Sequence, residues 1–348
     1  MSNVFDTWKQ VVLQSRHEML PIHNLENESQ INGLLVWKLK TGEWILGARE
    51  NRSLMIRMDS LYNHPELYIM DGKQDEYYLR FILKTAFECR FCYEGIVSLH
   101  AACVENCECA VAFTGKSGMG KSTRARAWTE GLGFEFISGD RPAVRLEKDG
   151  STACGVPWDG KEQIFRDVER PLKAIMEVRR SPANYIRKLS PDQARQLLMQ
   201  QSFVPMWDTD AAVMAMANVR ALIKKTPVYR VFCGPTQEDA REIYDILFNH
   251  PEQIREEQEE MKIKNGFVLR NVVDEFIVMP TGDNIAKFDG AVVLNDVSAF
   301  VFKQLQNAVS REDLLEAILA EYEIDCETAA KDLDVLLENF IQMGLLDA

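Results

Sequence analysis

One glycine-rich segment of the sequence has the spacing of a phosphate-binding loop. It reads GKSGMGKS from Gly115 to Ser122 and fits the pattern G-x-x-x-x-G-K-[ST]. Glycines there let successive backbone N–H groups face phosphate oxygens, and the N-terminus of a following helix adds positive potential. In such loops the lysine, here Lys121, reaches the β- and γ-phosphates, while the hydroxyl of Ser122 coordinates Mg²⁺. The segment therefore predicts binding of a nucleoside triphosphate such as ATP with Mg²⁺, and phosphotransfer as the reaction.

The segments on either side of the loop agree with this interpretation. The apolar run VAFTG precedes the loop as a strand, and residues 121–131 follow as a helix that is expected to break at Gly131 and Gly133. The alternative is a Gly/Ser turn with an exposed lysine. The residues expected to bind the nucleotide are Gly115, Lys116, Ser117, Gly118, Met119, Gly120, Lys121, Ser122 and Thr123.

Phosphoryl transfer also requires groups that hold the metal ion and orient the attacking hydroxyl. The strand-like run FEFISGD ends in Asp140, which places a carboxylate at a strand end beside the loop. Asp140 is therefore a candidate catalytic residue and metal ligand, and a turn aspartate before Arg141-Pro142 is the alternative. His100 lies on the strand before the loop, where a histidine is more often structural than catalytic.

The elements around these residues indicate an α/β domain over residues 96–248. GIVSLHAACVE and CAVAFTG are apolar runs joined by a polar turn, so a hairpin is expected to enter the loop. FEFISGD, AVRLEKDG and residues 169–180 read as further strands, and Ser190-Pro191-Asp192 starts a helix that runs to about Gln201. Strands that alternate with helices around such a loop favour the α/β class.

Three further regions complete the chain. Residues 1–95 mix short strand-like runs with an apolar helix at 77–93, so a small α+β region is expected. Residues 249–266 are mostly polar or charged and predict a linker, or a solvated extension of a helix at 236–248. Residues 267–348 predict three short strands followed by helices at 296–306, 311–322 and about 327–343. In this last region Ser310 and Asp313 fit a capping box, and Gly344 fits a helix end.

Composition and charge exclude several classes of protein. The chain has 348 residues, of which 46% are hydrophobic and 27% charged, as in globular proteins of two or three domains. No apolar run approaches the ~18 residues that cross a bilayer, and the first residues lack a signal-peptide pattern. A cytosolic protein without membrane contact is therefore expected. The formal net charge of −13 argues against binding of nucleic acid.

The three-strand, three-helix region could be a winged helix that binds DNA or a unit that binds a peptide, and its net charge distinguishes these two functions. Residues 267–348 carry 5 Lys/Arg and 16 Asp/Glu, a formal net charge of −11. DNA phosphates would be repelled, because their binding depends on basic side chains. A basic or amphipathic peptide suits this surface better.

The eight cysteines allow one competing interpretation. Cys89-x-x-Cys92, followed by Cys103, Cys107 and Cys109, has the composition of a zinc site. Cys89 and Cys92 lie, however, in an apolar helix where cysteine behaves as a small core residue. No second Cys-x-x-Cys occurs in the sequence, so reduced thiols are expected and structural zinc is the alternative.

Residues 96–246 resemble the catalytic domain of HPr kinase/phosphorylase and its relatives. SLHAACVENCECAVAFTGKSGMGKS and FISGDR reproduce that family's order of a strand histidine, a hairpin, a glycine loop and an acidic strand end. The resemblance implies the phosphoenolpyruvate-carboxykinase-like P-loop fold and a protein-serine kinase that uses ATP. By position, Asp140 matches the family's general base and His100 its active-site histidine. Relatives in this family often form rings, which makes a homo-oligomer a further expectation.

The sequence departs from that family at three points. Lys116 replaces the aspartate of the bifunctional enzymes, and the family's acidic pair is reduced to Gly139-Asp140. The family's later metal-binding glutamate has only a weak counterpart, Glu162 in the segment GVPWDGKEQ. The alternative makes this segment a surface loop in which Trp158 packs. These departures are compatible with kinase activity and put the phosphorylase reaction in doubt.

Residues 266–347 resemble PqqD-like proteins, the peptide-recognition elements for ribosomally made, modified peptides. Three strands, then VVLNDVSAFVFKQLQ, then helices ending in LLENFIQMGLL match that pattern, which implies a winged-helix-like unit of three strands and three helices. The family's role is to bind the leader segment of a precursor peptide as an added strand at an open sheet edge. The leader is expected along Phe288, Val292, Val293 and Leu294, against the final helix.

Together these features predict an ATP-dependent kinase that phosphorylates a Ser or Thr of a precursor peptide captured by residues 267–348. The main alternative is a nucleotide-binding or ATPase protein that delivers the peptide to a separate modifying enzyme, an idea that Lys116 favours. A kinase for a carrier protein of sugar uptake is a third hypothesis, and the appended peptide-binding unit argues against it.

Overall fold

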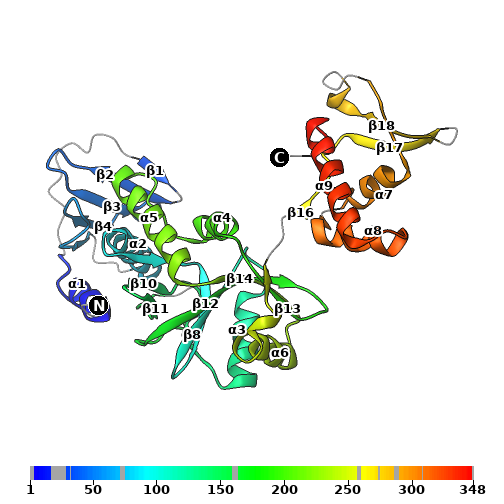
Figure 1. The fold of residues 1–348 in the computed structure, drawn as a ribbon. Coiled ribbons are helices and arrows are strands. Elements are labelled where there is room, and N and C mark those ends of the chain that lie inside the picture. Colours follow the sequence, from blue (N-terminus) through cyan, green and yellow to red (C-terminus); the bar gives the residue numbers. More distant parts are fainter. Residues whose placement is uncertain are drawn as a thin grey trace. The chain divides into compact units, whose positions relative to one another are not determined.

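The chain folds into two compact units (Figure 1). The computed structural model describes residues 4–16, 29–31, 33–70, 75–158, 164–256, 260–272, 275–285, 290–307 and 309–346. The first unit comprises residues 1–257 and the second residues 258–348. The division between them falls inside the charged segment 249–266.

A mixed ten-stranded sheet forms the centre of the first unit. Its long strand β12 (Glu169–Arg180) pairs in parallel with β8 (Cys109–Thr114) and with β14 (Val228–Cys233). Strand β7 (Ala101–Asn106) is antiparallel to β8, which confirms the predicted hairpin before the loop. The other strands of this sheet are β6 (Ile96–Ser98), β9 (Glu135–Ser138), β10 (Ala143–Glu147), β11 (Gly150–Cys154), β13 (Tyr185–Lys188) and β15 (Arg255–Glu256).

Helices cover both faces of this sheet, because its central strands are apolar on both faces. In β8, Val111 and Phe113 point to the face covered by α3 and α6, whereas Ala110 and Ala112 point to the face covered by α4 and α5. This two-residue alternation follows from strand geometry, and such continuous apolar runs are typical of strands buried on both sides. The four helices are α3 (Lys121–Leu132), α4 (Pro191–Gln201), α5 (Thr209–Lys225) and α6 (Gln237–Phe248). The expected α/β arrangement is therefore present.

Helix α3 does not break at Gly131, contrary to the prediction. It continues to Leu132, and Gly133 ends it in the left-handed conformation with φ +73°. A Cβ atom on Gly131 would lie 3.0 Å from the Cβ of Gln237, the first residue of α6. Glycine costs a helix interior about 1 kcal/mol relative to alanine. At this position its missing side chain lets α6 pack directly against α3.

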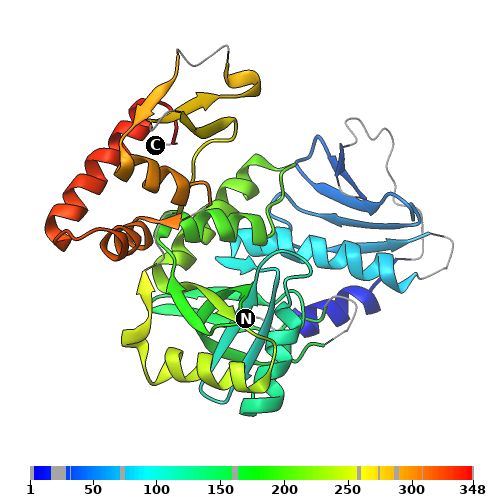
Figure 2. The ribbon, with the colours of Figure 1, turned by 90° about the vertical axis from the view of Figure 1, so that its right-hand side faces the viewer.

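The N-terminal part of the first unit is an antiparallel sheet with a helix on one face (Figure 2). Its strands follow chain order: β1 (Ser29–Ile31), β2 (Leu34–Lys38), β3 (Trp44–Ala48), β4 (Leu54–Met58) and β5 (Glu66–Ile69). Helix α1 (Val4–Leu13) precedes them and α2 (Glu76–Tyr93) follows. Because α2 packs against β3 and β4 and also against α5 and β6, no division between units occurs near residue 95. The short strand β4, which contains Arg57, is not predicted from the sequence.

The charged segment 249–266 is not a uniform linker, and the alternative of a continued helix is wrong. Helix α6 ends at Phe248, a short 3₁₀ turn covers Pro251–Gln253, and β15 then pairs with β13. Beyond the division, β16 (Glu260–Met261) pairs with β20 (Val309–Ser310) in the second unit. Ile254 packs on the core of the first unit and Ile263 lies in the core of the second. These two isolated apolar residues are hidden in a polar sequence, which explains the incomplete prediction.

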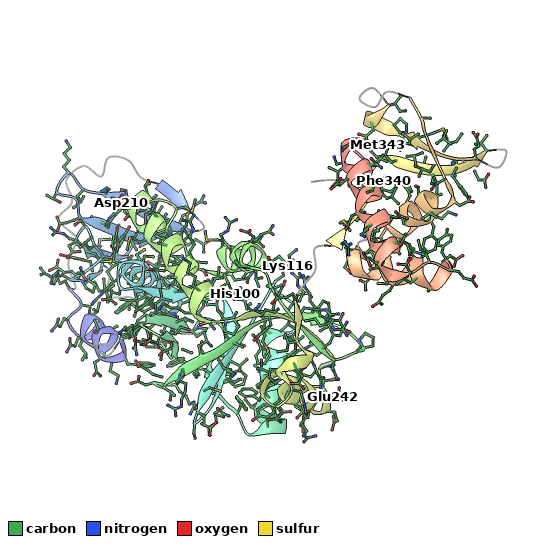
Figure 3. All side chains as sticks on the ribbon, in the orientation of Figure 1. His100, Lys116, Asp210, Glu242, Phe340 and Met343 are labelled. Atoms are coloured by element: carbon green, nitrogen blue, oxygen red, sulfur yellow. The ribbon has the colours of Figure 1, made fainter. Side chains whose placement is uncertain are left out.

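The described residues of the second unit include the predicted three-stranded sheet and three helices, in addition to the short β16–β20 pair. Its sheet has the order β17 (Phe267–Val272), β18 (Glu275–Pro280), β19 (Val292–Leu294). A 3₁₀ turn covers Gly282–Asn284, and the helices are α7 (Asp296–Gln304), α8 (Arg311–Glu321) and α9 (Cys326–Gln342). Phe340 of α9, labelled in Figure 3, is fully buried in the core of this unit. Ser310 Oγ accepts a hydrogen bond from Asp313 N at 3.1 Å, so the N-cap half of the predicted capping box is confirmed. The Asp313 carboxylate accepts from Ser310 Oγ at 2.6 Å.

Within the described ranges, no helix combines the length and the hydropathy that a bilayer-spanning helix requires.

Candidate nucleotide site

The glycine loop connects the end of β8 to the start of α3. Gly115, Gly118 and Gly120 adopt φ angles of +133°, +81° and +95°, which side chains with a Cβ rarely adopt. Gly120 is the N-cap of α3, and it offers no side chain to bond the first helical N–H groups. The loop therefore presents backbone N–H groups and a helix N-terminus to one side, which is the arrangement that binds phosphate.

Lys121 is held beneath this loop. Its Nζ donates to Gly115 O at 3.0 Å, and the side chain is buried. Burial lowers the pKa of Lys121, and the negative charge of Asp140 opposes that shift. A buried ammonium group with one carbonyl partner retains two N–H donors for an anionic ligand.

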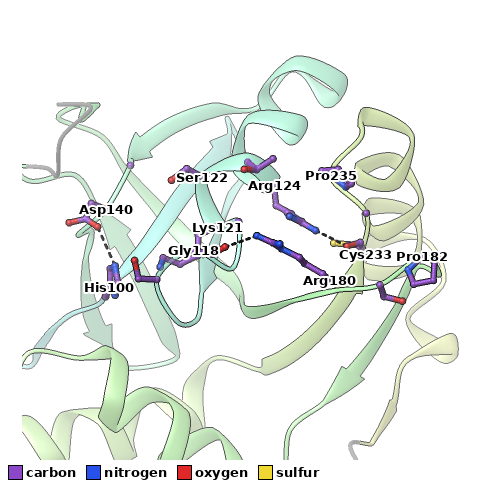
Figure 4. A pocket seen from close by; sticks show the side chains of 16 residues that line it. His100, Gly118, Lys121, Ser122, Arg124, Asp140, Arg180, Pro182, Cys233 and Pro235 are labelled. Atoms are coloured by element: carbon purple, nitrogen blue, oxygen red, sulfur yellow. Dashed lines mark hydrogen bonds and ion pairs between the residues drawn. The ribbon is translucent and has the colours of Figure 1, made fainter.

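A cavity of about 850 Å³ opens in front of the loop (Figure 4). This volume lies within the ~300–1,000 Å³ that is typical of small-molecule sites. The residues that line it come from the loop, from α3, from the position before β7 and from the turns after β9, β12 and β14. They are His100, Ser117, Gly118, Gly120, Lys121, Ser122, Thr123, Arg124, Gly139, Asp140, Arg180, Ser181, Pro182, Cys233, Gly234 and Pro235.

His100 and Asp140 meet at one end of this cavity. His100 Nε2 lies 3.3 Å from Asp140 Oδ1. The backbone fixes both residues, because Ala101 N donates to Asp140 O at 2.9 Å and His100 N donates to Gln201 O at 2.7 Å. The hydrogen bond from His100 lowers the pKa of Asp140, and burial opposes this effect. Asp140 is therefore a carboxylate at neutral pH.

The charge of the cavity suits a polyphosphate. Lys121, Arg124 and Arg180 line it, and among the described lining residues Asp140 is the only carboxylate. Arg180 also steadies the loop, because its guanidinium donates to Gly118 O at 2.8 Å. A positive site in a concave surface favours anionic ligands.

A second carboxylate, Glu177, lies beneath the start of the loop and is not predicted from the sequence. The residue is 5% exposed, and its carboxylate oxygens bind Arg179 at 2.7 Å and Arg230 at 2.8 Å. A Cβ on Gly115 would lie 3.7 Å from Glu177 Cγ. Because both of its oxygens are paired, Glu177 supports the loop as part of a buried ion network.

Not every residue of the predicted site faces the cavity. Ser117, Gly118, Gly120, Lys121, Ser122, Thr123, His100 and Asp140 line it, whereas Gly115, Lys116 and Met119 do not. Glu162 lies outside the described residues. Trp158 is 1% exposed and packs against Phe87 and Phe91, so the packing role foreseen for it is confirmed.

Sequence reasoning missed the far end of the cavity. Arg124, Arg180, Pro182 and the turn at Gly234 line it together with the predicted residues. The segment VYRVFCGP contained a usable signal, since Gly-Pro after a strand-like run marks a turn at a strand end. In open α/β sheets ligands bind at the carboxyl ends of the strands.

The oxygen atoms in the cavity fit Mg²⁺ better than a softer metal ion. Ser122 and Asp140 supply a hydroxyl and a carboxylate, and Mg²⁺ usually takes one or two protein oxygens together with phosphate oxygens and water. The described residues contain no group of three or more His, Cys, Asp or Glu arranged to hold a metal ion. A site of this kind depends on the phosphate groups of a ligand to complete the coordination.

Five of the eight cysteines are buried, whereas Cys107 and Cys326 are exposed. Cys89 and Cys92 are buried in α2, and all eight cysteines of the chain are unpaired. Burial raises the pKa of Cys92 to about 12 and that of Cys89 well above its ordinary value. Both thiols pack in the hydrophobic core around α2, as expected for small core residues.

In the second unit, β19 lies at an edge of the sheet. It pairs with β18, and the order β17-β18-β19 leaves its other side without a neighbouring strand among the described residues. Val293 is 59% exposed, Val292 is half-buried and Leu294 is buried. Phe288, which the sequence analysis placed beside them, lies outside the described residues.

Comparison with known families assigns part of the second unit. Residues 275–346 match the model of the family Coenzyme PQQ synthesis protein D (PqqD), which confirms the resemblance for this part of the chain. No curated protein matches the sequence.

Three solved structures are similar to parts of the chain. TbiB1 in complex with the TbiA(beta) leader peptide is 24% identical, with a TM-score of 0.22, over 25% of this chain and 95% of that chain. Lasso peptide synthetase B1 complexed with the leader peptide is 17% identical, with a TM-score of 0.22, over 26% and 99%. The Hpr(Ser) kinase/phosphatase from Coxiella burnetii is 11% identical, with a TM-score of 0.25, over 44% and 95%.

Proposed function

We propose that this protein is a peptide kinase that acts in the cytosol. It transfers the terminal phosphoryl group of ATP to a Ser or Thr hydroxyl of a ribosomally made precursor peptide, whose leader segment binds to residues 267–348. The observation that carries this proposal is the placement of Asp140, paired with His100, at one end of the loop cavity that also contains Lys121.

The loop supports binding of the triphosphate. Its N–H groups and the N-terminus of α3 would bind the phosphate chain, and Lys121 would contact the β- and γ-phosphates. Ser122, with Asp140, would hold Mg²⁺, which neutralises charge on the transferring group. The terminal phosphate then lies at the end of the cavity where Asp140 is found.

Asp140 supports the transfer step. An acceptor hydroxyl that hydrogen-bonds to its carboxylate is oriented towards the terminal phosphorus. The hydroxyl oxygen forms a bond to phosphorus as the bond to the bridging β–γ oxygen breaks, ADP leaves, and the hydroxyl proton passes to Asp140. His100 keeps the carboxylate ionised and fixes its orientation. Lys121 stabilises the charge on the departing phosphate oxygens.

The second unit supports the choice of a peptide as substrate. Residues 275–346 match the PqqD family, and β19 offers an exposed sheet edge to which an extended peptide can add as a strand. The charge of −11 over residues 267–348 favours a basic leader. A leader held there would raise the effective concentration of the acceptor segment at the site.

The test is mass spectrometry of peptides after incubation with Mg²⁺ and ATP. The substrates are synthetic peptides that correspond to the short reading frames next to this gene. We expect a gain of one phosphate with the unaltered protein, and a rate lower by about 10²–10⁴-fold with Asp140→Asn, the range that general-base residues contribute. An undiminished rate with Asp140→Asn would reject this role. Formation of ADP without a modified peptide would instead support a delivery ATPase.

A further inference from the structure

The end of the cavity opposite Asp140 is formed by two turns that each contain a proline. Arg180-Ser181-Pro182 follows β12, and Cys233-Gly234-Pro235 follows β14. These strands are parallel neighbours, and Arg180 is the register partner of Cys233, so both turns leave the sheet at the same edge. Figure 4 shows Pro182 and Pro235 on the side of the loop away from the His100–Asp140 pair.

The Cys233–Pro235 turn is fixed from both sides. Arg124 donates to Cys233 O at 2.8 Å, and Gly234 N donates to Asn184 Oδ1 at 3.3 Å. Asn184 Nδ2 in turn donates to Asp239 Oδ1 at 2.9 Å, and Asp239 forms a capping box with Thr236 at the start of α6. A Cβ on Gly234 would collide with Asp239 Oδ2, so a larger residue would displace this carboxylate from the network.

Arg124 connects this turn to the phosphate loop. It is the fourth residue of α3, directly after Thr123, and its side chain is 6% exposed. Its Nε is buried and has no hydrogen-bond partner among the described residues, although the side chain lines the cavity. Because Arg124 donates to Cys233 O at 2.8 Å, the guanidinium holds the turn at a fixed position relative to the loop.

The orientation of the triphosphate in the cavity determines which part of the nucleotide lies at the end formed by the two proline turns. If the terminal phosphate faces Asp140, as in the proposed function on which this inference rests, the α-phosphate and the nucleoside extend to the opposite side. We infer that the Arg180–Pro182 and Cys233–Pro235 turns form the nucleoside subsite, with Arg124 and Asn184 as positioning residues. The two prolines supply apolar surface for the base.

The composition of this subsite predicts weak discrimination between purines. The described residues that line it carry no carboxylate or carboxamide side chain. Asn184, just behind the turn, already uses both groups of its amide. Sites that hydrogen-bond a specific polar group discriminate by about 10⁴–10⁵-fold, whereas contacts of apolar shape give about 10–200-fold. We therefore expect the affinities for ATP and GTP to differ by at most about 10²-fold.

The experiment compares binding of a non-hydrolysable ATP analogue, the corresponding GTP analogue and inorganic tripolyphosphate by titration calorimetry with the full chain. Arg124 is buried and its loss can unfold the protein, so Asn184→Ala is the informative variant. Asn249→Ala is its matched control, because Asn249 Nδ2 also donates to a carboxylate, Asp245, at the other end of α6. Melting curves establish that each variant is folded.

We expect Asn184→Ala to lower the affinity for the ATP analogue by about tenfold, which corresponds to about 1.4 kcal/mol of binding free energy. The affinity for tripolyphosphate should not change. Asn249→Ala should change neither. Equal affinities of the unaltered protein for the ATP analogue and tripolyphosphate would overturn the nucleoside subsite. Equal loss of affinity for the ATP analogue and tripolyphosphate in Asn184→Ala would also overturn it. A difference in affinity between the ATP and GTP analogues above about 10³-fold would overturn it as well. Absence of binding for all three ligands would instead refute the proposed function.

Discussion

Asp140 Oδ1 lies 3.3 Å from His100 Nε2, because the two residues lie at the same end of an antiparallel pair of strands. His100 directly precedes β7, and Asp140 follows β9. The bond from Ala101 N to Asp140 O extends the β7–β9 pairing by one step and brings both side chains to the cavity. The sheet register therefore determines the geometry of the acid–histidine pair.

Lys121→Ala should abolish most phosphate transfer, because Lys121 is the buried cation directly behind the loop. Loss of one preorganised donor to a developing charge lowers kcat by about 10²–10³-fold. The measurement is the rate of ADP formation at saturating peptide. Lys148→Ala, which removes an exposed lysine from the turn between β10 and β11, is the control and should retain the full rate. A Lys121→Ala protein that is folded and fully active would contradict the proposed role of the loop.

His100→Ala should change the pH dependence of activity at the acid side. The hydrogen bond from His100 holds the pKa of Asp140 below its ordinary value of 3.8, and without it burial raises that pKa. The acid limb of kcat/KM should therefore move to higher pH in the variant. His64→Ala is the control, because His64 also pairs with a carboxylate, Asp59 at 3.0 Å, but is outside the cavity.

The Asp140–His100 pair should stabilise the folded protein in a way that depends on pH. Because the pKa of folded Asp140 is lowered, its contribution to the free energy of unfolding is present above pH 3.8 and is lost as the pH falls through the folded pKa. His100→Ala should remove this contribution at neutral pH and leave little difference from the unaltered protein at the acid end. Thermal melting from neutral pH down to about pH 2 measures this loss, because the folded pKa lies below 3.8. A difference that stays constant with pH would contradict the assignment.

Val293→Lys should weaken binding of a basic leader peptide. Val293 is 59% exposed on the edge strand β19, and a lysine on an edge strand opposes pairing with a further strand. We expect a loss of about tenfold in affinity, or about 1.4 kcal/mol. Val272→Lys is a matched control on the opposite edge, because Val272 of β17 is 47% exposed. Equal effects of the two variants would show that the charge, rather than the β19 edge, is responsible.

Phe340→Ala should unfold or loosen the second unit and leave nucleotide binding intact. Phe340 is fully buried in that unit's core, and such truncations cost about 3–5 kcal/mol. Val335→Ala removes an apolar side chain that is 58% exposed on the same helix and should cost less than about 0.5 kcal/mol. Denaturant unfolding with a titration of ATP analogue measures both effects. Loss of nucleotide binding in Phe340→Ala would show that the units are energetically coupled.

The sequence predicts those structural elements that are formed by residues close together in the chain. The glycine loop, the hairpin before it and the cap of α8 depend on residues a few positions apart, and the sequence predicts all three. The three strands and three helices of the second unit are predicted for the same reason, since alternation and helical spacing are visible in short windows.

The features that the sequence does not predict depend on contacts between distant segments. The sequence predicts that Gly131 ends α3, whereas the helix continues to Leu132. The glycine is explained by its contact with Gln237 of α6. Arg124 lines the site because it bonds the turn after β14, and no local pattern links these two positions. The pairing of β15 with β13 similarly depends on a sheet edge that a polar segment does not reveal.

The close approach of α3 and α6 at Gly131 constrains how this protein can move. Each helix carries one wall of the cavity, because the phosphate loop leads into α3 and the Cys233–Pro235 turn leads into α6. Direct contact between the two helices favours a fixed distance between the phosphate loop and the Cys233–Pro235 turn. A nucleotide that binds as proposed would meet two walls already in place, and little conformational entropy would be lost on binding.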